Sequence, residues 1–104
     1  MDENIQTEIK DSIKKGISNL PDRLADWTKV HLCNPKKVKL SNDPEGKYFS
    51  YYWMVTDNTG TDDSSYRVVY DEKTRMFGLE CTLANGLEWY MGAYGTFEET
   101  IENM

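Results

Sequence analysis

The segment MFGLECTLANGLEWYMGAYGTFEETIENM, residues Met76–Met104, decides the fold of this chain of 104 residues. Apolar side chains alternate with other side chains in two runs, 77–83 and 87–93. A period of two residues is typical of a β-strand with one buried face. Because the two runs are separated by a short segment, we expect two antiparallel strands joined as a β-hairpin.

The length of the hairpin loop determines which side chains share a face. If Asn85 and Gly86 alone formed the loop, the apolar side chains of the two strands would be split between both faces. A loop of three residues begins at Ala84 and places Gly86 in the left-handed conformation. Leu83 then pairs with Leu87, and the apolar side chains of both strands lie on one face. The sequence therefore predicts the three-residue loop.

A short helix is expected after the hairpin. Thr96 is a typical N-cap residue, and Glu99 three positions later completes a capping box. Phe97, Ile101 and Met104 recur at the spacing of one helical face. The helix can therefore pack its apolar side against the sheet.

The N-terminal part of the chain has helical periodicity. Its apolar stripe consists of Ile5, Ile9, Ile13, Ile17, Leu20, Leu24 and Trp27. Gly16 is a plausible helix end, Asn19 a plausible N-cap, and Pro21 is tolerated in a first turn. We expect two helices, at about 3–15 and 20–31, or one kinked helix.

Further strands are expected between these helices and the hairpin. Turn signals at Asn34-Pro35, 43–46 and 71–74 bound short strands at 38–40, 47–57 and 65–70. These turns and strands predict a single α+β domain over residues 1–104. One or two N-terminal helices and a short C-terminal helix pack on one face of a four- or five-stranded antiparallel meander.

Composition excludes several classes of protein. Hydrophobic residues make up 38% and charged residues 29% of the chain, which is a globular balance. The net charge is −6, and residues 48–104 carry ten acidic and three basic side chains. We therefore expect no nucleic acid and no membrane as partner, no cofactor, and a cytoplasmic location. Cys33 and Cys81 are too few for a disulfide framework or a zinc site.

Three polar candidates are expected to be structural. His31 and Cys33 could form a base and a nucleophile, but catalysis would need an orienting partner that the sequence does not identify. In the predicted register Glu80 and Glu88 are diagonal neighbours, at a spacing that an acid and a base could use. The loop Asp57–Asp63 offers oxygen ligands without the spacing of a calcium loop. No metal site is predicted, and catalysis is not expected.

The strongest candidate is the sheet face that the helices do not cover. Its expected members are Tyr48, Tyr52, Met54, Glu80, Glu88, Tyr90 and Tyr94. Aromatic side chains and methionine with an acidic rim are typical of a protein-binding surface. We therefore expect a protein-binding module of inhibitor, immunity or chaperone type. The competing hypothesis is a small enzyme or ligand-binding domain, with a helix–sheet pocket using Glu80, Glu88 or His31, and a homodimer that acts through its open face is a third.

Overall fold

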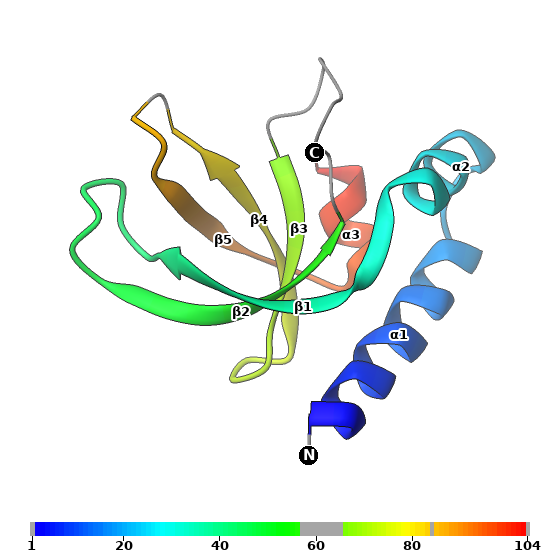
Figure 1. Cartoon of the computed structure of the whole chain (residues 1–104). Helices are drawn as coiled ribbons and strands as arrows, with labels where there is room; N and C mark the ends of the chain where they lie inside the picture. The colour runs from blue at the N-terminus through cyan, green and yellow to red at the C-terminus, as the bar shows by residue number, and fades with distance from the viewer. Residues whose placement is uncertain (1, 57–65, 84, 104) are drawn as a thin grey trace.

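The structure, a computed structural model, describes residues 2–56, 66–83 and 85–103 of the chain. In chain order its elements are α1 (Asp2–Ser18), α2 (Asp22–His31), β1 (Leu32–Ser41), β2 (Phe49–Thr56), β3 (Tyr66–Asp71), β4 (Met76–Thr82), β5 (Glu88–Gly95) and α3 (Phe97–Glu102). Consecutive strands pair in antiparallel fashion. The predicted α+β fold with helices on a five-stranded antiparallel meander is therefore confirmed (Figure 1).

The N-terminal helices differ from the prediction at their junction. Gly16 does not end α1, which continues to Ser18. A Cβ on Gly16 would lie 2.9 Å from Cδ2 of Phe97, so the glycine lets α3 approach α1 closely. Asn19 does not cap α2; its side-chain amide donates a hydrogen bond to Glu98 at 3.0 Å, and the N-cap is Pro21.

The first strand is longer than the sequence predicted. β1 begins at Leu32, directly after α2, and the expected turn at Asn34-Pro35 lies within it. The pairing with β2 shifts between Leu32 and Lys36, so this segment bulges instead of turning. The side-chain amide of Gln6 donates to the Pro35 carbonyl at 3.1 Å and holds the bulge against α1.

The predicted hairpin loop is confirmed on its described residues. The Leu83 amide donates to the Leu87 carbonyl at 2.8 Å, and Gly86 has φ +88°. Glu80 pairs with Tyr90, as the three-residue loop requires. Ala84, at the start of the loop, lies outside the described residues.

Beyond Tyr90 the two strands of this hairpin leave the predicted register. The first register shift lies between Glu80 and Leu79, because Leu79 pairs with Gly92 and not with the preceding residue. A second shift lies next to Gly78. Gly92 has φ +138°, and a Cβ on Gly78 would lie 2.3 Å from the Gly92 carbonyl oxygen. Ala93 is exposed, although the simple alternation predicted that it faces the core. Such bulges bend a strand and increase its twist.

This bending closes the sheet into a barrel. Ser41, at the end of β1, pairs in parallel with Trp89 near the start of β5. Within the described residues this is the one paired position between β1 and β5. Figure 1 shows the tips of the β1–β2 and β4–β5 hairpins on the side of the molecule away from α1 and α2.

Two hydrophobic clusters lie on the two faces of the curled sheet. The larger cluster joins the outer face to the helices and includes Ile9, Ile13, Trp53, Val55, Val68, Tyr70, Phe77, Leu79, Phe97 and Ile101. The smaller cluster lies inside the barrel and consists of Leu40, Tyr52, Met54 and Val69, with Cys33, Val38 and Tyr90 packed against it. The predicted capping box of α3 is confirmed, since Thr96 accepts from the Glu99 amide and Glu99 accepts from the Thr96 amide.

Candidate functional site

Several side chains that we expected on an open face lie inside the barrel. Tyr52, Met54 and Glu80 are 5%, 9% and 1% exposed, and Tyr90 is half-buried. The expectation of an open face is therefore wrong for these residues. Because the sheet curls, its uncovered face becomes the interior of the barrel.

Two tyrosines pack against each other across this interior. The rings of Tyr52 on β2 and Tyr90 on β5 are stacked, with centroids 4.2 Å apart. Since β2 and β5 are not neighbours in the sheet, this contact spans the barrel. The Tyr52 hydroxyl donates to the Asn42 side chain, and burial raises the pKa of Tyr52. The pair therefore serves packing.

An arginine that we did not single out from the sequence organises the polar part of the interior. Nε of Arg67, on β3, lies 3.1 Å from Oε1 of Glu80, and its Nη2 lies 3.4 Å from Oε2 of Glu88. Nη2 also donates to the Thr82 hydroxyl at 3.0 Å. We call Arg67, Glu80 and Glu88 the Arg67 cluster. One cation in it faces two carboxyl groups, so the cluster is short of positive charge.

Burial dominates the protonation of Glu80. It raises the pKa of this carboxyl to about 7; Arg67 opposes the rise and Glu88 adds to it. Its second oxygen, Oε2, is buried and has no hydrogen-bond partner among the described residues. Burial therefore favours the protonated form of the Glu80 carboxyl. Because Glu80 is almost fully buried, the diagonal pair of carboxyl groups is not open to a substrate.

Two exposed aromatic residues of β2 lie on the outer face instead. Phe49 and Tyr51 of β2 are 44% and 60% exposed, because the helices cover the outer face only beyond them. Lys39 Nζ lies 5.3 Å from the Phe49 ring centroid, and Lys37 Nζ lies 5.8 Å from that of Tyr51. We call these four residues the lysine–aromatic face. Each lysine lies within the range of a cation–π interaction.

A groove runs beside this face. Its volume is about 580 Å³, and its lining includes Lys37, Phe49 and Tyr51 with Glu72 and Lys73 of the β3–β4 turn. The surface is thus hollowed and carries more positive than negative side chains. The charge of this surface is thus opposite to that of the second half of the chain, residues 48–104, which is strongly acidic.

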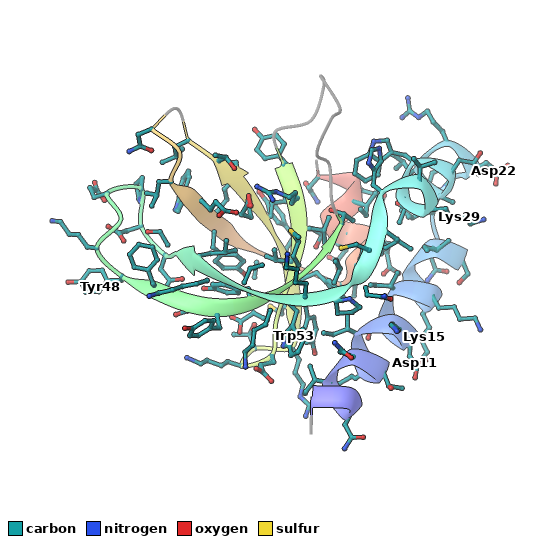
Figure 2. All side chains as sticks on the ribbon, viewed as in Figure 1. Asp11, Lys15, Asp22, Lys29, Tyr48 and Trp53 are labelled. Atoms are coloured by element: carbon teal, nitrogen blue, oxygen red, sulfur yellow. The ribbon has the colours of Figure 1, made fainter. Side chains whose placement is uncertain are left out.

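The remaining predicted residues are dispersed. Tyr48 is 70% exposed at the end of the β1–β2 loop, and Figure 2 shows it on the side of the molecule away from the helices. Tyr94 is exposed on β5, whereas Glu88 belongs to the Arg67 cluster.

His31 contacts an aromatic ring, and the Cys33 thiol donates a hydrogen bond to a backbone carbonyl. The His31 ring centroid lies 4.4 Å from that of Trp27, and Cys33 Sγ lies 3.8 Å from the Met54 carbonyl oxygen. The Asp57–Asp63 loop, which we considered for calcium, lies outside the described residues. Among the residues that are described, no three His, Cys, Asp or Glu side chains form a group that could hold a metal ion.

Comparisons with known proteins give no assignment. No protein-family model matches the chain, and searches of curated proteins and of solved structures find no match either. Within the described part of the chain, no helix combines the length and the apolar character needed to cross a membrane.

The sequence contains weak signals for the two features that we did not predict, the lysine–aromatic face and the Arg67 cluster. Lysines at positions 37 and 39 alternate on β1, in the same way as the aromatic residues of the next strand. Arg67 lies between apolar and aromatic residues of β3, and in the meander it stands opposite Glu80. An arginine at such a position indicates an internal ion pair.

Proposed function

We propose that this protein works by binding another protein and that it holds an acidic segment of the partner on the lysine–aromatic face. The observation that carries this proposal is the exposure of Phe49 and Tyr51 directly beside Lys39 and Lys37. Exposed aromatic side chains beside a groove are typical anchors of protein interfaces. Lysines next to them favour carboxylates on the partner.

Charge favours a protein over a nucleic acid as the partner. Single-stranded nucleic acid also binds surfaces that combine aromatic and basic side chains. Such binding depends on many phosphate contacts. The lysine–aromatic face offers two lysines on a chain of net charge −6. An acidic protein segment needs fewer cations, and the exposed rings supply its apolar contacts.

Affinity capture with matched variants tests this proposal. The purified protein serves as bait in an extract of its native host, and mass spectrometry identifies what it retains. We compare it with Phe49→Ser/Tyr51→Ser and with a control, Val30→Ser, which changes a side chain 77% exposed on α2. A fourth bait, Tyr94→Ser, tests the β5 surface predicted from the sequence. Loss of two anchors should weaken a real complex at least about tenfold.

The pattern across the baits decides the outcome. A protein retained by the parent, Val30→Ser and Tyr94→Ser, but lost by Phe49→Ser/Tyr51→Ser, supports the lysine–aromatic face. Equal retention by all four baits refutes that surface. Recovery that nuclease treatment abolishes refutes the protein partner in favour of nucleic acid. A homodimer and a cytoplasmic location remain predictions, and light scattering over a concentration series tests the former.

A further inference from the structure

A separate groove lies at the start of β1, where this strand leaves α2 and passes α1. Its volume is about 640 Å³. The lining includes Lys10, Ile13, Lys14 and Ile17 of α1 with Leu32 and Asn34 of β1. Its lining shares no residue with the groove beside the lysine–aromatic face. It is therefore a distinct concave surface.

The floor of this groove is apolar and held in place. Ile13 belongs to the main core, whereas Ile17 and Leu32 are only half-buried and leave apolar surface uncovered. The hydrogen bond from Gln6 to the Pro35 carbonyl fixes the β1 bulge against α1. The groove is thus formed before anything binds, which lowers the entropic cost of binding.

The rim of the groove carries two positive charges. Lys10 and Lys14 are exposed and one helical turn apart, and neither forms an ion pair among the described residues. Like charges at this spacing repel each other. An anion between them would relieve this repulsion, and the exposed Asn34 amide lies in the same lining.

We propose that this groove binds a small amphipathic carboxylate. Its apolar chain lies over Ile17 and Leu32, and its carboxylate lies between Lys10 and Lys14. The volume of the groove is within the range of small-molecule sites, about 300–1,000 Å³. The charge of the rim and the apolar floor together select this class of ligand, because an uncharged chain would leave the two lysines unpaired.

Titration with sodium decanoate, followed by amide NMR spectra of the full chain, tests the proposal. We expect saturable 1:1 shifts at residues 10–17 and 32–34, with little change at the β3–β4 turn. Decanol, which lacks the charge, should bind more weakly by about tenfold. The charge-reversed variant Lys10→Glu/Lys14→Glu should lose affinity by a similar factor.

A control variant separates the local charge from the net charge. Lys15→Glu/Lys29→Glu makes the same change in net charge at two exposed positions outside the lining of the groove, labelled in Figure 2, and should bind as the parent does. The amide spectra also show whether each variant is folded. Absence of decanoate binding, equal binding of decanol, unchanged affinity after reversal of Lys10 and Lys14, or shifts centred elsewhere would each overturn the proposal.

Discussion

The buried carboxyl of Glu80 should make the stability of this protein depend on pH in an unusual direction. Its Oε1 pairs with Arg67, while Oε2 lies buried without a hydrogen-bond partner among the described residues. Ionisation of the group is therefore disfavoured in the folded protein. The perturbation that we consider is Glu80→Gln, which keeps the shape of the side chain and removes the proton equilibrium.

The magnitude follows from the two pKa values of Glu80. Its ordinary pKa of 4.5 applies to the unfolded chain, and burial raises it to about 7 in the folded protein. Between these values the folded state binds more protons, so the free energy of unfolding falls as pH rises. The full difference corresponds to about 3 kcal/mol, most of which develops between pH 5 and pH 8.5.

The other carboxyl groups whose pKa is shifted affect the free energy of unfolding outside the range from pH 5 to pH 8.5. A hydrogen bond from the Tyr48 amide lowers the pKa of Asp43. A hydrogen bond from its own backbone amide lowers the pKa of the Glu98 carboxyl. Stability from such groups is lost only as pH falls below their ordinary values. Burial raises the pKa of the Cys81 thiol above 9.0, so this group also stays protonated up to pH 8.5.

Urea denaturation at four pH values between 5 and 8.5 measures the effect. The parent protein should lose about 2–3 kcal/mol of unfolding free energy across the window, and Glu80→Gln should lose less than about 1 kcal/mol. The matched control is Glu88→Gln, whose side chain is 46% exposed and which should keep most of the dependence. An equal slope in the parent and in Glu80→Gln would show that Glu80 does not titrate in this range, and the reasoning from its burial would fail.

Two further substitutions test how the fold is closed. Gly78→Ala should reduce the unfolding free energy by about 3 kcal/mol, since the added Cβ would meet the Gly92 carbonyl. Gly86 has open space around it, so Gly86→Ala should reduce the unfolding free energy by only about 1–2 kcal/mol. Equal losses in urea denaturation would contradict the close approach at Gly78. Thr96→Ala removes the acceptor of the Glu99 amide and should cost about 1 kcal/mol; an unchanged midpoint would refute the capping box.

The features that were predictable from the sequence are local. The capping box depends on residues three positions apart, and the hairpin loop depends on the phase of alternation on its two sides. The sequence also placed Tyr52 and Met54 on one face of β2, and they pack together in the smaller cluster, whereas Trp53 and Val55 pack in the larger one. In each case the information lies within one or two neighbouring elements.

Closure of the barrel could not be predicted in the same way. It depends on the Ser41–Trp89 bridge between the ends of the sheet, and on register shifts next to Gly78 and Gly92. A flat sheet and a curled sheet share the same alternation of side chains. The signals that favoured curling were the glycines within β4 and β5, which are typical of bulges.

Curling also reverses which face of β2 can meet a partner. In a flat sheet with helices on one side, Tyr51 would be covered and Tyr52 exposed. In the barrel, Tyr52 stacks on Tyr90 inside, whereas Tyr51 stands beyond the helices and is 60% exposed. Since neighbouring residues of a strand point to opposite faces, this reversal moves the candidate surface by a single position in the sequence. The surface changes in chemistry as well, because the Glu80 carboxyl goes inside with Tyr52 while Lys37 and Lys39 stay outside with Tyr51. A partner selected by the curled sheet should therefore be acidic, whereas a flat sheet would have presented the acids itself.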